Sequence, residues 1–173
     1  DNETIKKTVT AFADAYNGLV KLMREQTAYN ESAKTAGTLQ GDSTAVGMMN
    51  KLRTMIGGSS GAATVFTRLA DIGLEPQRDG TLGVNASKLD SALGRIDELK
   101  AFFARDEDGT ASDGFGTMLR QFTDLTLGAD GAISTRQESL RTRIDGISER
   151  TARMEDRLLL TEKRLREQYT RLD

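Results

Sequence analysis

Three aspartates that lie close together are the first candidates for chemistry in this chain: Asp106, Asp108 and Asp113. Carboxylate oxygens are the ligands that Ca²⁺ prefers in proteins. An EF-hand loop needs Gly at its sixth position, however, and counting from Asp106 places Gly109 fourth. The segment is therefore interpreted as an acidic surface loop, and no metal site is expected.

Cysteine and histidine are both absent, which removes thiol nucleophiles, Ser-His pairs and zinc sites built on Cys or His. The glycines Gly57, Gly58 and Gly61 lack the Lys-Ser/Thr pair of a phosphate-binding loop. Ser, Lys and carboxylates remain, but no two titratable groups form a recognisable catalytic dyad. The sequence thus predicts no catalytic residue, no cofactor and no enzyme activity.

The strongest periodic signal is an arginine at every seventh residue near the C-terminal end. These arginines, called the arginine stripe below, are Arg136, Arg143, Arg150, Arg157, Arg164 and Arg171. Each of them precedes a position on a heptad seam that advances in alternating steps of four and three. The apolar members of this seam are Ile133, Leu140, Ile144, Ile147, Met154, Leu158, Leu165 and Leu172. The spacing predicts one helix of roughly 60 Å that must bury its seam against another helix.

The charges beside the seam bear on its partner. With the four-residue steps read as d to a, the stripe occupies g positions, which face the charges of a partner helix in a coiled coil. Glu167 can pair with Arg164 and Arg171 along the helix, whereas the four earlier arginines have no acid three or four residues away. We expect acidic residues across the interface. In the alternative, the arginines cover the seam and stay solvated.

Composition narrows the class of protein further. The net charge of -2 offers no general attraction to nucleic acid, and no apolar run approaches the length of a membrane span. Aromatic residues make up 5%, Trp is absent and Pro occurs once. These features predict a mainly helical chain with neither nucleic-acid binding nor membrane insertion.

Apolar spacing predicts a helical bundle ahead of the long helix. A heptad helix covers residues 3–27, a loop covers residues 30–43, and Asp42 or Ser43 caps a short helix. Asp79-Gly80 predicts a hairpin near residues 74–84, and Asn85 or Ser87 caps a helix that extends to Phe103. One more helix begins near Phe115. The fold class is therefore mainly α, a helical bundle with one small β-hairpin and a long C-terminal coiled-coil helix.

Several segments, in order, resemble the C-terminal part of the flagellar hook-associated protein 2 family, the filament cap proteins. The segments are residues 12–19, residues 37–44 with Leu52-Arg53, residues 69–74, Asp79-Gly80-Thr81-Leu82 with Lys88-Leu89, and Arg157-Leu158 with residues 162–169. Asn85 departs from the family pattern, where Asp is more usual, and so does Tyr169, where Phe is common.

The resemblance implies a helical leg domain over residues 1–131 and a coiled-coil helix over residues 132–173, against which an N-terminal segment of the protein packs. It also implies a non-enzymatic assembly protein, secreted by the flagellar type III pathway, that forms a homo-oligomeric ring at the filament tip and promotes flagellin insertion. Flagellin, the hook-filament junction protein and an export chaperone that binds the C-terminal helix are the implied partners.

Two other interpretations stay open on the sequence. The chain could be another axial protein of the flagellum, flagellin or the hook-filament junction protein, since these share paired terminal helices. It could also be an intracellular helical adaptor or chaperone. Gly41-Asp42-Ser43-Thr44 and Asp79-Gly80-Thr81-Leu82 favour the filament cap.

Overall fold

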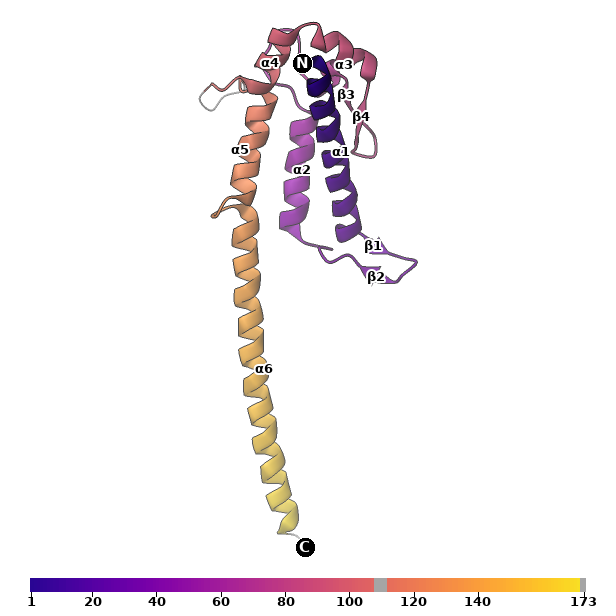
Figure 1. The fold of residues 1–173 in the computed structure, drawn as a ribbon. Helices are drawn as coiled ribbons and strands as arrows, with labels where there is room; N and C mark the ends of the chain where they lie inside the picture. The colour runs from indigo at the N-terminus through magenta and orange to yellow at the C-terminus, as the bar shows by residue number, and fades with distance from the viewer. Residues whose placement is uncertain (108–111, 172–173) are drawn as a thin grey trace. The chain divides into compact units, whose positions relative to one another are not determined.

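The structure, a computed structural model, describes residues 1–107 and 112–171 of the chain, which is mainly helical (Figure 1). The helices are α1 (Asn2–Thr27), α2 (Ser43–Gly57), the 3₁₀ helix η1 (Leu69–Ile72), α3 (Ala86–Leu93), α4 (Ile96–Ala104), α5 (Phe115–Leu127) and α6 (Ala132–Thr170). The strands are β1 (Tyr29–Asn30), β2 (Thr35–Ala36), β3 (Leu74–Pro76) and β4 (Leu82–Val84). Contacts divide the chain into two compact units, Asp1–Thr126 and Leu127–Asp173.

Helix α1 supplies one wall of the first unit. The Asp1 carboxylate accepts the Thr4 N–H at 2.8 Å and caps the helix, as a side-chain acceptor at this position should. Its buried face repeats at helical spacing along α1, and α2 lies beside it (Figure 1). The buried residues of α1 are Val9, Ala13, Tyr16 and Val20. The prediction of a helix over residues 3–27 is therefore confirmed.

The predicted hairpin near residues 74–84 is confirmed, with β3 and β4 antiparallel. Its turn depends on Gly80, whose φ is +80°, and on Asp79, whose carboxylate accepts both the N–H and the hydroxyl of Thr81 at 3.0 and 2.6 Å. Leu74 and Leu82 are buried. The Asp-Gly signal was therefore a sound guide to this turn.

The predicted loop over residues 30–43 also contains a short ribbon that the sequence did not indicate. Tyr29 and Asn30 pair with Thr35 and Ala36 as a second two-stranded ribbon. Two-residue strands are too short to show alternation, so the pattern that reveals a strand was missing. The ribbon is followed by Gly37, which lies so close to the Gln26 carbonyl that a side chain there would overlap it.

The helix predicted to extend to Phe103 is two helices. Gly94 ends α3, its N–H bonding to the carbonyls of Ala92 and Ser91, and α4 begins at Ile96. The Glu98 carboxylate in the first turn of α4 accepts the N–H groups of Thr64 and Val65 at 3.0 and 3.2 Å. The sequence did not reveal this break, because the apolar residues before and after it keep the same helical spacing across residues 89–103.

The core of the first unit collects side chains from all its helices and from β3 and β4. An aromatic cluster closes it, in which Phe12 meets Phe115 edge-on at 5.9 Å and Phe102 stacks on Phe115 at 6.2 Å. Asp42 caps α2 and Asn85 caps α3. Each of them is one of the two residues predicted for that cap. Tyr16, Leu52, Phe66, Leu69 and Leu93 are buried in this core.

The second unit is mostly α6, a helix of 39 residues. It starts at a tight turn in which the Gly131 N–H and the Ser134 hydroxyl both donate to the Gly128 carbonyl, at 2.8 and 3.1 Å. The prediction of a long C-terminal helix is confirmed.

Candidate assembly surface

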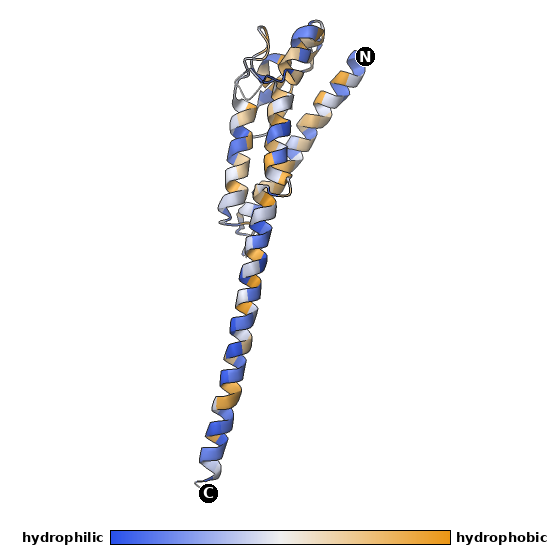
Figure 2. Cartoon of the chain, turned by 90° about the vertical axis from the view of Figure 1, so that its left-hand side faces the viewer, coloured by the Kyte–Doolittle hydropathy of each residue, from blue (hydrophilic) through white to orange (hydrophobic). Residues whose placement is uncertain are grey.

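The seam of α6 is exposed in this structure. No side chain of α6 is buried, and the exposed fraction runs from 39% for Leu140 to 64% for Met154 and Leu158. Ile133 is half-buried, and Leu172 lies outside the described residues. In Figure 2, apolar residues recur along this otherwise hydrophilic helix. Because tertiary packing supplies most of the stability of helices in proteins, α6 has an unused surface for a partner.

The arginine stripe flanks this seam. Among the described residues, Arg143, Arg150, Arg157 and Arg164 form no ion pair, and all four are exposed. Arg136 is half-buried near the start of the helix. Four cations on one flank, each without a counter-ion in its own helix, give α6 a marked positive edge beside its apolar stripe.

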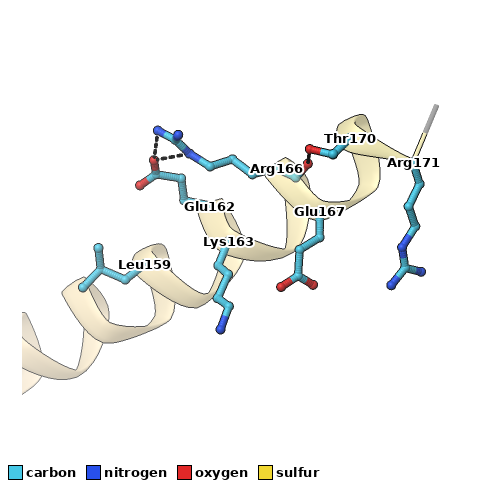
Figure 3. A pocket seen from close by; sticks show the side chains of 7 residues that line it. All are labelled: Leu159, Glu162, Lys163, Arg166, Glu167, Thr170 and Arg171. Carbon is cyan, nitrogen blue, oxygen red and sulfur yellow. Dashed lines mark hydrogen bonds and ion pairs between the residues drawn. The ribbon is translucent and has the colours of Figure 1, made fainter. Parts of the chain in front are cut away.

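The ion pairs of α6 lie elsewhere than predicted. Arg153 pairs with Glu149 at 3.4 Å and Arg166 with Glu162 at 2.7 Å (Figure 3), both with the acid four residues before the base, which is the favourable order. Glu167 pairs with neither Arg164 nor Arg171. Arg164 precedes Glu167 by three residues, which is the reverse order, and Arg171 follows Glu167 by four residues but lies past the last helical residue.

In the first unit, three segments that carry the family resemblance meet at the hairpin. The Leu82 N–H donates to the Asn17 side-chain oxygen at 2.7 Å, and the Asn17 amide donates to the Leu82 carbonyl at 2.9 Å. Arg53 of α2 passes Gly80, where an added Cβ would be 3.4 Å from the Arg53 Nε. Burial raises the pKa of Tyr16, and the nearby Arg53 charge partly offsets this. The hairpin is thus bonded to α1 through Asn17 and lies next to Arg53 of α2.

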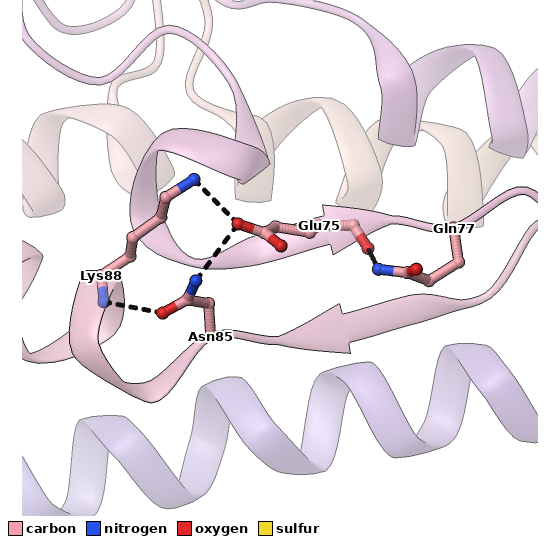
Figure 4. A network of polar contacts seen from close by, with 4 residues as sticks. All are labelled: Glu75, Gln77, Asn85 and Lys88. Carbon is pink, nitrogen blue, oxygen red and sulfur yellow. Dashed lines mark hydrogen bonds and ion pairs between the residues drawn. The ribbon is translucent and has the colours of Figure 1, made fainter.

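A polar network joins β3 to the start of α3 (Figure 4). The Lys88 ammonium donates to Glu75 Oε1 at 2.8 Å, and this bond lowers the pKa of Glu75. Asn85 caps α3 through the Lys88 N–H at 3.1 Å and donates its amide to the same Glu75 oxygen at 3.4 Å. An aspartate at this position could accept the Lys88 N–H in the same way but could not donate to Glu75.

Two of the three aspartates considered for Ca²⁺ make contacts with other residues of the chain. The Asp113 carboxylate is buried and accepts the Glu107 N–H at 2.9 Å and the Gln121 amide at 3.1 Å, while Asp106 pairs with Arg120 at 3.0 Å. Asp108 lies outside the described residues. No group of three potential metal ligands occurs within residues 1–107 and 112–171.

An apolar groove of about 350 Å³ opens on the first unit. Its walls come from α1, β3, α4 and α5, and the Phe103 and Phe115 rings line it. Sequence reasoning did not find this groove, because its residues lie on four separate elements whose packing no local pattern specifies.

A comparison with known families identifies the chain. The model of the family described as "Flagellar hook-associated protein 2 C-terminus" matches residues 1–173. The chain belongs to this family. Membership agrees with the resemblance seen in the sequence and decides against the alternatives of another axial protein or an intracellular adaptor.

Individual relatives match over nearly the whole chain. The lateral flagellar hook-associated protein 2 of Vibrio parahaemolyticus is 28% identical over 174 residues, which are 100% of this chain and 37% of the relative. The B-type flagellar hook-associated protein 2 of Pseudomonas aeruginosa is 27% identical over 176 residues, 99% of this chain and 36% of the relative. The chain thus spans little more than a third of the length of these curated relatives.

A solved structure supports the same assignment. The crystal structure of the D1-D2-D3 domains of the flagellar cap protein FliD from Escherichia coli superposes with a TM-score of 0.68 at 26% identity, over 80% of this chain and 37% of that one. Among the residues that the structure describes, no helix has both the length and the apolar character needed to cross a membrane.

Proposed function

We propose that this chain is the C-terminal part of a flagellar filament cap, a structural assembly protein rather than an enzyme. The observation that carries the proposal is the exposed seam of α6, a 39-residue helix without a buried side chain in a chain whose family consists of hook-associated proteins. Full burial of one leucine or isoleucine contributes about 1.5–3 kcal/mol, so covering the seam would strongly stabilise a complex.

The seam is a coiled-coil surface in this proposal. Its partner is an N-terminal segment of the same protein, as the sequence resemblance implied, and acidic residues on that segment face the arginine stripe. The exposed side chains of Ile144, Ile147 and Leu158 fit this role, since a/d positions of a coiled coil insert between residues of the facing helix. The first unit has a core of its own.

The complete protein forms a homo-oligomeric ring at the tip of the filament, where it promotes insertion of flagellin and contacts the hook-filament junction protein. It reaches the tip by the flagellar type III pathway. Before export, a chaperone covers the C-terminal helix. The exposed seam supports this last step, because exposed apolar stripes promote aggregation unless a partner covers them.

Gene deletion tests the proposal. Cells without the gene should release flagellin into the medium and carry short filaments or none, and the wild-type gene should restore filaments of normal length. Electron microscopy and quantification of secreted flagellin measure both effects. Filaments of normal length in the deletion strain would contradict a cap function.

A further inference from the structure

Three consecutive leucines, Leu158, Leu159 and Leu160, give α6 a second apolar surface. A heptad seam uses one of them, Leu158. Successive residues of a helix are about 100° apart, so Leu159 and Leu160 lie on the side opposite the seam. Their exposed fractions are 64% and 68%. A helix that covers the seam would leave these two leucines exposed. We therefore expect them to contact a different partner.

The charges around these leucines follow a pattern. One and two turns before them on the same face are Asp156 and Arg153, and one and two turns after them are Lys163 and Glu167. Figure 3 shows Lys163 and Glu167 projecting to the same side of the helix. From Arg153 to Glu167 the face has the order base, acid, Leu, Leu, base, acid. Read from Glu167 to Arg153, with each acid replaced by a base and each base by an acid, the order is the same. A surface of this kind is complementary to an inverted copy of itself.

We propose that the face formed by Arg153, Asp156, Leu159, Leu160, Lys163 and Glu167 binds the same face of a second copy of this chain, with the two helices antiparallel. A twofold axis between residues 159 and 160 places each leucine beside its own counterpart. Asp156 then faces the second copy's Lys163, and Arg153 lies within one residue rise of the second copy's Glu167. Both ion pairs occur twice.

The free charges support this occupant. Asp156, Lys163 and Glu167 have no ion-pair partner among the described residues, and Arg153 has only the 3.4 Å contact with Glu149. A parallel copy in register would set Asp156 against Asp156 and Lys163 against Lys163. A membrane or a nucleic acid would favour a single sign of charge, which this face does not present.

This contact leaves the seam free, because the two surfaces lie on opposite sides of α6. It is also small, about four helical turns around two leucines, and small contacts of this kind are weak. We therefore expect an equilibrium between monomer and dimer that is visible only at high protein concentration, about 100 μM or more.

Charge exchange tests the pairing in the 173-residue chain. Asp156→Lys and Lys163→Asp should each weaken self-association in sedimentation velocity roughly tenfold, since each creates two like-charge contacts. The double variant should regain the wild-type constant. Asp145→Lys, a matched control on the same side of α6 but about two turns before Arg153 and so outside the contact, should change nothing. Loss without recovery in the double variant, or no effect of either single change, overturns the proposal.

Crosslinking tests the orientation, and the chain has no cysteine that would interfere. Across the proposed axis Ala152 lies beside the second copy's Arg166 but about 22 Å from the second copy's Ala152. A mixture of Ala152→Cys and Arg166→Cys chains should therefore form a disulfide-linked dimer, while each variant alone should not. Self-crosslinking of either variant indicates a parallel pair and overturns the proposal. Absence of any crosslink at high concentration, or binding of this face only when flagellin is added, also overturns it.

Discussion

The side chain of Asn17 on α1 bonds to both backbone polar groups of Leu82 on β4, although the two residues are 65 positions apart in the sequence. Its oxygen accepts the N–H at 2.7 Å and its amide donates to the carbonyl at 2.9 Å. β4 pairs with β3 on its other edge. The Asn17 side chain thus makes the hydrogen bonds that a neighbouring strand would make at this edge of the ribbon.

Replacement of Asn17 tests this relationship. Asn17→Ala should lower the free energy of unfolding of the chain by about 2 kcal/mol, because it leaves a part-buried N–H and C=O without partners. Urea denaturation followed by circular dichroism measures the change. Asn50→Ala is the control, since Asn50 is an exposed helical residue with no side-chain bond among the described residues, and it should stay within about 0.5 kcal/mol of wild type. Equal effects of both changes would contradict the assigned role.

The backbone at Gly73 gives a second prediction. Its φ is +90°, and a Cβ there would lie 2.5 Å from the Asn85 carbonyl oxygen and 2.9 Å from the Leu89 nitrogen. Gly73→Ala should therefore destabilise the chain by about 2 kcal/mol or more. Gly18→Ala on α1 has open space around it and should be neutral or stabilising by up to about 1 kcal/mol. In thermal unfolding, Gly73→Ala should lower the Tm, whereas Gly18→Ala should leave it unchanged or raise it. A tolerated Gly73→Ala would contradict the strain argument.

Local chemistry explains which parts of the fold were predictable. Asp42, Asn85 and Asp79-Gly80 act on backbone groups within three residues, so their roles are legible in the sequence. The long helix was predictable for a different reason, since its seam persists over many turns. The confirmed predictions therefore rest on short-range bonds or on extended repetition.

The features that were missed depend on contacts between distant segments. Asn17 belongs to a segment that carries the family resemblance, yet nothing near it in the sequence indicates that its side chain bonds to Leu82. The same holds for the apolar groove. In α6 a usable signal did exist, because three successive leucines exceed what one stripe can hold, and Leu159 and Leu160 had to face elsewhere.

Acidification should destabilise the first unit. Burial raises the pKa of Asp71, but hydrogen bonds from the N–H groups of Thr67 and Arg68 and from the Thr67 hydroxyl outweigh it, so the pKa is lowered from 3.8. The Thr81 hydroxyl and N–H lower that of Asp79, and the Thr64 hydroxyl and the Thr64 and Val65 N–H groups lower that of Glu98. A lowered carboxyl pKa stabilises the fold above the unfolded value, and this stability is lost as the pH falls through the folded value.

The free energy of unfolding should accordingly decline from about pH 4.5 downward, where the unfolded chain begins to bind protons that the fold excludes. Urea titrations at pH 5.5, 4.5 and 3.5 measure this slope. Asp71→Asn should reduce the slope, whereas Asp124→Asn should not, because the exposed Asp124 makes no bond among the described residues. Stability that is constant or increases over this range would contradict the bonding described for Asp71.

The arginine stripe of α6 either faces acidic residues of a partner helix or stays solvated, and a charge reversal distinguishes the two. If Arg143, Arg150 and Arg157 face acids on a partner helix, changing all three to Glu should weaken assembly of the full-length cap protein by about 0.3–1 kcal/mol per position. Salt near 1 M, where the Debye length is about 3 Å, should restore part of the loss. Size-exclusion chromatography at low and high salt compares the proteins. Equal assembly of triple variant and wild type at low salt would show that the stripe is only a solvated flank.

The most direct test of the assembly account is light scattering on the full-length cap protein at micromolar concentration, with the seam intact and with Ile144→Asp and Ile147→Asp. The wild type should have a mass several times that of one chain, while the seam variant should be monomeric or largely so. A matched variant with Thr142→Asp and Ser148→Asp, off the a and d positions, should assemble much as the wild type does. A wild-type protein that stays monomeric, or a seam variant that assembles as well as the wild type, would contradict the claim that α6 serves assembly through its seam.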